Sequence, residues 1–493
     1  HMSLVLNDSE AAEEFAAQWH QLDPQPESTA AYATALVRKG KVDRAVEIFV
    51  EFVETVPAGG DEPFGSVASM LSRPEFSEFA LPTMEGLVQR DPAEPLAALS
   101  LSRLAYRAED LNKAFLAANR AIALDPELLS ARLVRAQVLL NRGDTDAALD
   151  DLQAVLKEQP TNVRILNSVA NTYLLRGDEA IAKELLLRVL AVSPDDATAI
   201  LALAKTAVKS GDYSAASRYF LRLYELNEEP GLAAYYLGAV AEEGDKFDEA
   251  IDWYRRVRGG PQLERAQERI AAVMMRRGDL QLAREHLEGV RSALPHLAAR
   301  FYRLEAEMLH ADQRPDSAMK VFAKGIEAFP EDADLRYSRS LLLVELGAYG
   351  LAEKDLLVAL QTSPDDSKLL NALGYTLADK TERYDEAYAY IAKALDIEPE
   401  SPSIMDSMGW VLYRQGKINE AVEFLRNAYL QMREPEIAAH LGEVLWAQGE
   451  RLDAESIWRN ALSRSGSQGQ RILKETVNRV APTLAPAMLK GYE

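Results

Sequence analysis

A repeat of about 34 residues constrains the fold of this chain more than any other feature of its sequence. Prolines recur at positions 24, 57, 92, 126, 160, 194, 230, 261, 295, 330, 364, 399 and 435. One alanine in each interval keeps the same spacing: Ala45, Ala80, Ala114, Ala148, Ala182, Ala216, Ala250, Ala283, Ala318, Ala352, Ala387, Ala421 and Ala454. A second small residue precedes nearly every one of these alanines by roughly one-third of a repeat: Ala33, Ser102, Ala136, Ala170, Ala204, Gly238, Ala271, Ala306, Ser340, Gly374, Gly409 and Gly442. These three coupled series predict a stack of similar units.

Each unit has the sequence pattern of two helices. Helical periodicity opens the unit, as in residues 199–208, and a turn such as Arg-Gly-Asp at 142–144 or 176–178 follows it. Glycine accepts the left-handed conformation that ends a helix, and the proline ends the second helix. Two helices at close range need small residues where they cross, which explains the alanine and glycine series. The pattern predicts an all-α fold with roughly 75–80% helix, far above the usual third.

The pattern resembles the tetratricopeptide repeat (TPR). The Leu-Gly element of that family stands at 237–238, 373–374 and 441–442, and its Ala-x3-Phe/Tyr element stands at 45–49, 216–220, 250–254 and 318–322. The resemblance implies a right-handed α-solenoid of about 11–13 TPR helix pairs over residues 27–468. Within it, residues 58–92 form a degenerate unit, because Pro63, Pro74 and Pro82 interrupt its helical pattern.

The N-terminal segment lies outside the array. Residues 1–2 resemble an expression scar, and residues 3–26 comprise a predicted helix and a proline-containing linker. The helix covers residues 8–20 and has Phe15 and Trp19 on its apolar face. It either caps the open end of the solenoid or docks onto a partner protein, and the sequence leaves both open.

The C-terminal segment, residues 469–493, is predicted to be a capping helix and a tail. Residues 463–469 have the composition of a loop, and residues 471–480 form an amphipathic helix. Pro482 and Pro486 favour an extended conformation for the last residues.

Composition excludes several classes of function. The chain has 493 residues, no cysteine, and 77 acidic against 55 basic side chains, for a net charge of −22. A chain without cysteine has no disulfide, no thiol nucleophile and no cysteine-ligated metal. The negative charge disfavours nucleic acid as a partner. Part of that charge has a structural explanation, since acidic residues often follow the repeat prolines, where they complement helix N-termini.

Catalytic patterns are missing from the sequence. The six histidines are scattered, and neither a phosphate-binding loop nor a nucleophile elbow occurs. We therefore expect no enzymatic activity, no cofactor and no metal site.

The first helices of the repeats are expected to line a concave, protein-binding wall. Projecting the repeat places aromatic and amide side chains on it, which are effective anchors for polypeptide: Tyr106, Asn167, Asn171, Tyr235, Tyr337, Tyr375, Trp410, Tyr413 and Trp446. Packing between neighbouring repeats is the alternative role of these residues. A basic cluster that includes Arg265, Arg300 and Arg303 either receives an acidic partner segment or forms local salt bridges with neighbouring glutamates.

As a whole, the chain resembles the TPR outer-membrane lipoproteins that serve Gram-negative bacteria as adaptors for a periplasmic carboxyl-terminal processing protease. The resemblance implies one surface that binds and activates this serine protease and another that collects substrates such as peptidoglycan cross-link hydrolases. It also implies a location at the periplasmic face of the outer membrane, with a lipid anchor upstream of Ser3 as the sole link to the membrane. A scaffold for another multiprotein complex, cytoplasmic or in the envelope, is the alternative.

Overall fold

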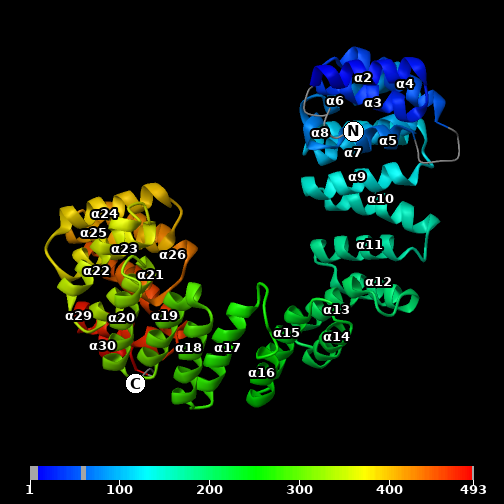
Figure 1. Cartoon of the computed structure of the whole chain (residues 1–493). Helices are drawn as coiled ribbons and strands as arrows, with labels where there is room; N and C mark the ends of the chain where they lie inside the picture. Colours follow the sequence, from blue (N-terminus) through cyan, green and yellow to red (C-terminus); the bar gives the residue numbers. More distant parts are fainter. Residues whose placement is uncertain (1–8, 57–62, 491–493) are drawn as a thin grey trace. The chain divides into compact units, whose positions relative to one another are not determined.

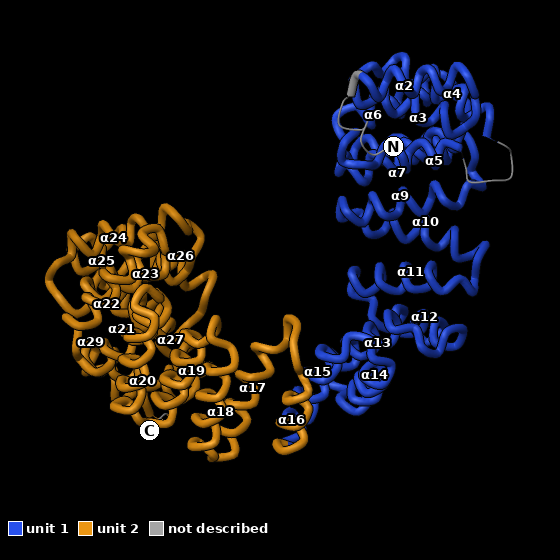
Figure 2. Tube along the Cα trace, in the orientation of Figure 1, with its two compact units in different colours: residues 1–246 blue, residues 247–493 orange. Residues whose placement is uncertain are grey.

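The computed structural model describes residues 9–56 and 63–490 of the chain. Within these residues the fold is 81% helical and contains no strand, and 29 α-helices follow one another along the chain (Figure 1). The helices form two compact units, residues 1–246 and residues 247–493, which we call unit 1 and unit 2 (Figure 2). The predicted all-α fold is confirmed, whereas the hand of the superhelix stays a prediction.

Unit 1 consists of consecutive helix pairs. The six pairs are α3 (Pro26–Arg38) with α4 (Val42–Thr55), α5 (Pro63–Leu71) with α6 (Ser77–Arg90), α7 (Pro95–Arg107) with α8 (Leu111–Leu124), α9 (Leu129–Arg142) with α10 (Thr145–Glu158), α11 (Val163–Arg176) with α12 (Glu179–Val192), and α13 (Ala197–Lys209) with α14 (Tyr213–Glu225). Helix α2 (Ser9–Leu22) precedes the pairs, and α15 (Pro230–Glu243) follows them. We call the earlier helix of each pair its first helix.

Unit 2 begins with α16 (Phe247–Tyr254) and continues with six more pairs. They are α17 (Leu263–Arg276) with α18 (Leu280–Ala293), α19 (Ala298–Ala311) with α20 (Pro315–Ala328), α21 (Ala333–Glu345) with α22 (Tyr349–Thr362), α23 (Ser367–Lys380) with α24 (Tyr384–Ile397), α25 (Pro402–Arg414) with α26 (Ile418–Gln431), and α27 (Pro435–Gln448) with α28 (Arg451–Arg464). Helices α29 (Ser467–Val480) and α30 (Ala485–Met488) end the unit. The twelve pairs agree with the predicted number of about 11–13. Helices α15 and α16 correspond to one further repeat of the sequence pattern.

The small-residue series marks where the two helices of a repeat touch. All thirteen alanines of the main series are buried, twelve of them with no exposed surface. In α7, Ser102 replaces the usual alanine or glycine, and its hydroxyl donates a hydrogen bond of 2.7 Å to the carbonyl of Ala114 in α8. The two series are therefore the two sides of one helix crossing.

Glycine occupies this crossing where the helices approach most closely. A Cβ atom on Gly409 in α25 would lie 2.5 Å from Cγ of Leu425 and 3.0 Å from the carbonyl oxygen of Ala421, both in α26. Gly374 is equally confined by Ile391 and by the carbonyl of Ala387. At these positions no side chain fits unless the second helix moves.

Buried ion pairs add a polar connection inside some pairs. Asp151 of α10 is buried and accepts two hydrogen bonds from Arg135 of α9, at 2.7 and 2.6 Å. Asp355 of α22 accepts the same two-pronged contact from Arg339 of α21, at 2.6 Å for both bonds. Both pairs have the same spacing in sequence, so the device recurs at the same place in the repeat, once in each unit.

The degenerate unit is irregular, but one of its prolines does not break a helix. Helix α5 has only nine residues, and a short 3₁₀ turn over Pro74–Phe76 separates it from α6. Helix α6 runs through Pro82 without interruption. Residues 57–62, the start of the degenerate unit, lie outside the described part of the chain.

The two ends of the chain differ in detail from the expectations. Helix α2 ends at Leu22 and the next helix begins at Pro26, so the predicted linker is a tight turn. At the other end, α29 already begins at Ser467, inside the predicted loop, and the expected extended tail contains α30 over 485–488. Pro486 does not prevent this, because a proline in the first turn of a helix sacrifices no hydrogen bond. Residues 1–8, which include the predicted expression scar, and residues 491–493 are outside the described ranges.

The helix crossings make a testable prediction about stability. Gly409→Ala should destabilise unit 2 by ~1–3 kcal/mol, because the new methyl group overpacks the contact with Leu425 and Ala421. Gly289→Ala is the matched control: Gly289 lies inside α18, and no neighbour lies within 4 Å of the place that an added methyl group would take. Alanine there should stabilise by roughly 0.5–1 kcal/mol. Denaturant titrations of both variants check the opposite signs, and equal effects would contradict the crossing geometry.

Candidate functional site

The predicted groove residues all lie on first helices or on α15. In unit 1, Tyr106 is on α7, Asn167 and Asn171 are on α11, and Tyr235 is on α15. Asn171 is exposed, whereas the other three are half-buried. Tyr106 accepts a hydrogen bond of 2.9 Å from Asn141 of the next pair, so it also connects neighbouring repeats. These residues are spread over three helices, α7, α11 and α15.

Asn167 has an unusual hydrogen-bonding state. Its amide nitrogen donates to Asp196 at 3.1 Å, but its buried amide oxygen accepts no hydrogen bond among the described residues. Asp196 in turn caps the N-terminus of α13 through the backbone NH of Ala199. The amide nitrogen of Asn167 therefore connects neighbouring repeats, whereas its amide oxygen has no hydrogen-bond donor among the described residues.

The arginine cluster of unit 2 forms local salt bridges. Arg300 contacts Glu264 and also donates to Glu268 at 2.6 Å. Arg303 lies 3.5 Å from Asp334 and 3.9 Å from Glu307. Arg265 is exposed on α17. The structure thus favours the second of the two roles expected for this cluster, because the charges of Arg300 and Arg303 are already compensated.

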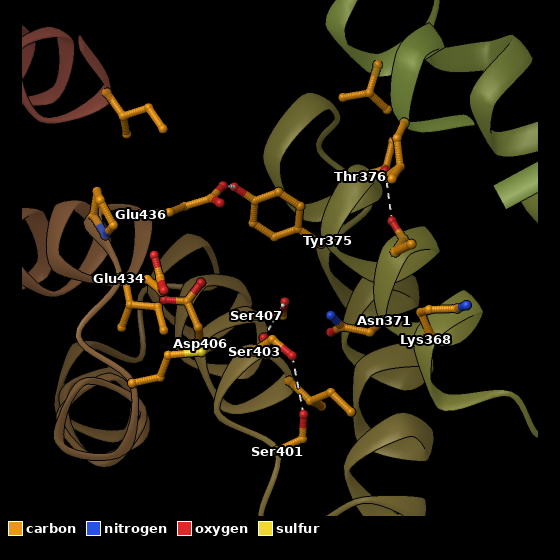
Figure 3. A pocket seen from close by; sticks show the side chains of 18 of the residues that line it. Lys368, Asn371, Tyr375, Thr376, Ser401, Ser403, Asp406, Ser407, Glu434 and Glu436 are labelled. Atoms are coloured by element: carbon orange, nitrogen blue, oxygen red, sulfur yellow. Dashed lines mark hydrogen bonds between the residues drawn. The ribbon is translucent and has the colours of Figure 1, made fainter. Parts of the chain in front are cut away.

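The remaining predicted residues lie near a concave groove of unit 2. A cavity of about 960 Å³ is lined by first helices α21, α23, α25 and α27 and by α29 (Figure 3). Tyr337 and Tyr375 belong to its wall. A second cavity of about 1050 Å³ adjoins it, and Tyr375, Glu436 and Ile472 line both. Trp410 and Tyr413 line the second cavity, whereas Trp446 packs against Trp458 of α28 with ring centroids 6.0 Å apart.

A hydrogen bond crosses the boundary between the two cavities. The Tyr375 hydroxyl on α23 donates to Oε1 of Glu436 on α27 at 3.0 Å, as Figure 3 shows. It also lies 3.4 Å from Nε2 of His440. Burial, together with the negative charges of Glu436, Asp379 and Asp406, raises the pKa of the Tyr375 phenol well above its ordinary value. Tyr375 is therefore a neutral donor at any physiological pH.

A buried histidine–carboxylate pair lies next to this bond. Nδ1 of His440 on α27 lies 2.9 Å from Oδ2 of Asp406 on α25, and the imidazole stacks on Trp410 with centroids 4.2 Å apart. Trp410 also donates from its indole nitrogen to Asp379 at 3.2 Å. Burial lowers the pKa of His440, but the charge and hydrogen bond of Asp406, with Glu436 and Asp379 behind them, outweigh burial and raise the pKa.

This pair does not form a catalytic triad. The neighbour of His440 Nε2 is the Tyr375 phenol, which is itself committed to Glu436. The described serines of the groove are engaged elsewhere: Ser407 donates to the backbone of Ser403 at 3.1 Å. The His440–Asp406 contact connects the neighbouring first helices α25 and α27 and fixes the imidazole against the ring of Trp410.

Helix α29 closes the far side of the groove. Arg479 donates two hydrogen bonds, at 2.8 and 2.6 Å, to the buried carboxylate of Glu443 on α27. A two-pronged contact of this kind fixes both the distance and the orientation of the two helices. Ile472 of the same helix reaches both cavities. The C-terminal helix is thus part of the groove as well as a cap.

The N-terminal helix has one packed face and one exposed face. Ala16 is buried against the first repeat, and polar contacts fasten the helix: Glu13 to Lys41 at 2.6 Å, and His20 to Glu51 at 3.2 Å. Phe15 is 54% exposed. Leu22, which lies on the same face of the helix as Phe15, is 85% exposed. Trp19 is half-buried. The predicted apolar face is therefore divided between packing and solvent.

No cluster of metal-ligating residues occurs in the described part of the chain. Among the same residues, no helix has both the length and the apolar character that a membrane crossing requires.

Comparison with known proteins identifies the repeat. Tetratricopeptide-repeat family models match residues 311–367, 367–401 and 403–430, and the model of the tetratricopeptide repeat protein 21 C-terminal ARM domain matches residues 107–259. The chain is therefore a tetratricopeptide-repeat protein, as its sequence pattern predicted.

One curated relative shares substantial sequence. It is a TPR repeat-containing protein of Pseudomonas aeruginosa, 39% identical over 206 residues, which is 42% of this chain and 35% of that protein. The match thus spans about a third of the relative's length.

Two solved structures show weaker likenesses. Yeast Tom70 has a TM-score of 0.41 at 15% identity, covering 87% of this chain and 96% of that one. A thermophilic TPR protein of Thermus thermophilus has a TM-score of 0.33 at 20% identity, covering 36% and 99% respectively. Likenesses this distant carry no functional argument.

Sequence reasoning missed the charged and polar residues of the groove. The groove-facing residues of a first helix lie at fixed distances from the glycine at its crossing. In α25, for example, they are six and three residues before Gly409 and one and four residues after it. Most of the chosen aromatics occupy the later two positions, and the missed residues occupy the same frame: Lys368, Asn371, Ser403, Asp406, Glu436 and Glu443. Applying the frame to every residue type, rather than to aromatics and amides alone, would have identified this set, though not His440.

The buried histidine predicts a pH-dependent stability. The folded-state pKa of His440 lies above its unfolded value of about 6.5, so its pair with Asp406 stabilises unit 2 fully below that pH. The contribution is lost as the pH rises through the folded-state pKa. His440→Gln should therefore lower the melting temperature more at pH 6 than at pH 9, measured by scanning calorimetry. His296→Gln, at an exposed histidine of the same unit, is the control and should show no such pH dependence.

Proposed function

We propose that this chain is a noncatalytic adaptor that binds and activates a periplasmic carboxyl-terminal processing serine protease and brings it substrates such as peptidoglycan cross-link hydrolases. Tetratricopeptide repeats are typical of protein-binding scaffolds, which supports the binding role. The protease partner rests on the whole-chain resemblance described above. In this proposal a lipid anchor holds the protein at the periplasmic face of the outer membrane.

The exposed face of α2 is the observation that carries the docking role. Phe15 and Leu22 are seven residues apart, so they lie on the same side of the helix, two turns apart. The opposite side is fastened to the first repeat through Ala16, Glu13 and His20. A large aromatic presented on an ordered helix loses little conformational entropy when a partner covers it. The helix is thus both a cap and a preorganised docking element.

The test replaces the exposed residues of α2 and leaves its packed face intact. Phe15→Ala with Leu22→Ala should weaken binding of a carboxyl-terminal processing protease about thirtyfold, since an interface hot spot is worth ~2 kcal/mol or more. The melting temperature should hardly change, because both side chains are already largely in solvent. A binding titration by calorimetry measures the first effect, and a thermal scan measures the second.

Two further variants separate docking from capping. Leu116→Ala removes another exposed leucine of unit 1, 68% exposed on α8, and should leave protease binding unchanged. Ala16→Asp places a charge in the packed contact and should lower stability by releasing the helix. Intact protease affinity in the Phe15 and Leu22 double variant would contradict docking through α2.

Activation needs its own measurement. The protease should cleave a peptidoglycan cross-link hydrolase faster in the presence of this chain, and the double variant of α2 should lose that effect. If the wild-type chain bound other envelope or cytoplasmic proteins but not the protease, the alternative role as a scaffold of another complex would replace this proposal.

A further inference from the structure

The first cavity of the unit 2 groove has a strongly unbalanced charge, unlike the second, where Lys380, Arg414 and Arg479 lie among the carboxylates. Five carboxylates and a single ammonium group line the first cavity, and several of them are visible in Figure 3. The charged residues are Glu345, Glu398, Asp406, Glu434, Glu436 and Lys368. A concave surface focuses the field of such charges and favours an occupant of the opposite sign.

Only part of this charge is compensated within the protein. Asp406 is paired with His440, Glu345 lies 2.9 Å from Nε2 of His310, and Glu398 accepts a hydrogen bond of 2.5 Å from the hydroxyl of Ser367. Lys368 is occupied by Asp334 at 3.2 Å and by the ring of Tyr337, 4.7 Å away.

The carboxylates of Glu434 and Glu436 have no cationic partner among the described residues. Glu436 accepts a hydrogen bond from the neutral phenol of Tyr375, which leaves the charge uncancelled. The side chain of Glu434 has no hydrogen-bond or ion-pair partner among the described residues. Two carboxylates without a cationic partner in the described part of the chain, Glu434 and Glu436, therefore lie close together at the start of α27 (Figure 3).

An unsatisfied amide lies in the wall of the same groove. Oδ1 of Asn371 on α23 is buried and accepts no hydrogen bond within the described structure. Figure 3 places the Asn371 side chain in the cavity wall, facing the serines of α25. An amide can pair with the NH and C=O groups of an extended polypeptide, and a buried oxygen without a partner costs free energy until a donor arrives. The groove thus offers a backbone contact beside its acidic side.

We propose that this groove binds an extended polypeptide segment that carries arginine or lysine, with the cationic side chain on Glu434 and Glu436 and the main chain on Asn371. The inference deepens the proposed adaptor function, on which it rests, by naming the chemistry of the cargo. Charge complementarity selects the occupant: an acidic segment would be repelled by the carboxylates, and the only lysine of the first cavity is already paired.

The Tyr375–Glu436 bond gives the proposal a distinctive consequence. The phenol occupies one oxygen of Glu436, so a cationic ligand must share or displace it. Tyr375→Phe keeps the ring and removes only the hydroxyl donor, which frees the carboxylate. The variant should bind a basic segment about threefold more tightly, a gain that damage to the groove would not produce.

The experiment measures fluorescence anisotropy of a labelled peptide with the full chain. The probe is a serine- and glycine-rich peptide of about twelve residues with two arginines, and matched peptides carry glutamine or glutamate in their place. The arginine peptide should bind, its affinity should fall with added salt, and the other two should bind at least about tenfold more weakly. Equal affinity for the arginine and glutamine peptides would overturn the proposal.

Matched variants locate the site. Glu434→Gln with Glu436→Gln should weaken binding of the arginine peptide about tenfold. Glu420→Gln with Glu423→Gln makes the same change of charge at exposed positions of α26 outside the groove lining and should leave the affinity unchanged. Equal losses from both double variants would assign the effect to net charge alone and overturn the groove as the site. Asn371→Ala should weaken the binding that remains for the glutamine peptide as well, because it removes a main-chain contact.

The outcome is separable from the test of the adaptor function. The α2 double variant leaves the groove intact, so it should bind the arginine peptide like the wild type while losing the protease. Protease binding without arginine-dependent peptide binding would refute the cargo inference alone. Peptide binding without protease binding would refute the proposed adaptor role and leave a scaffold with a basic-segment groove.

Discussion

The fold depends on one contact, the crossing of the two helices within each repeat. A buried alanine on the second helix faces alanine, serine or glycine on the first, and the helices approach as closely as these residues allow. At Gly409 the nearest atoms belong to the backbone and a branched side chain of α26, so the distance cannot be adjusted by a rotamer change alone. Within each unit, the regular repeats use the same contact and so present their first helices in the same orientation to their neighbours, whereas the degenerate unit is the exception. The regularity of the array is a consequence of steric limits at one position in the repeat.

That regularity determines what the groove can contain. When first helices lie side by side in one orientation, the same few positions of each helix face the concave surface. In α23, α25 and α27 these positions hold polar, aromatic and acidic side chains that reach one another across repeats, as Tyr375 reaches Glu436. The pair of His440 and Asp406 is buried beneath them and stacks on Trp410. The same residues therefore serve packing and the groove surface, because the aromatic rings pack beneath the charged groups that line it.

The sequence predicted the repeating fold because its causes are local and periodic. Glycine turns, helix-ending prolines and small crossing residues recur at fixed intervals, and each has one structural interpretation. The predicted helix through Phe15 and Trp19 exists, but its division into a packed and an exposed face depends on which side meets the first repeat, a tertiary choice that periodicity does not encode. Likewise, the sequence left two roles open for Arg300, and only the structure places Glu264 and Glu268 beside it. Pro82 inside α6 shows the same limit, since packing on both sides retains a helix that the proline alone would interrupt.

The adaptor role that we propose does not depend on how the two units are arranged. The exposed face of α2 belongs to unit 1 and the acidic groove to unit 2, and each is complete within its own unit. A chain that binds a protease at one surface and a cargo segment at the other raises the effective concentration of one for the other through the connection alone. The cargo site then needs only modest affinity, because the gain comes from tethering rather than from contact area. The proposed groove ligand, a cationic side chain with a stretch of main chain, suits this requirement because such a motif is short and makes few contacts.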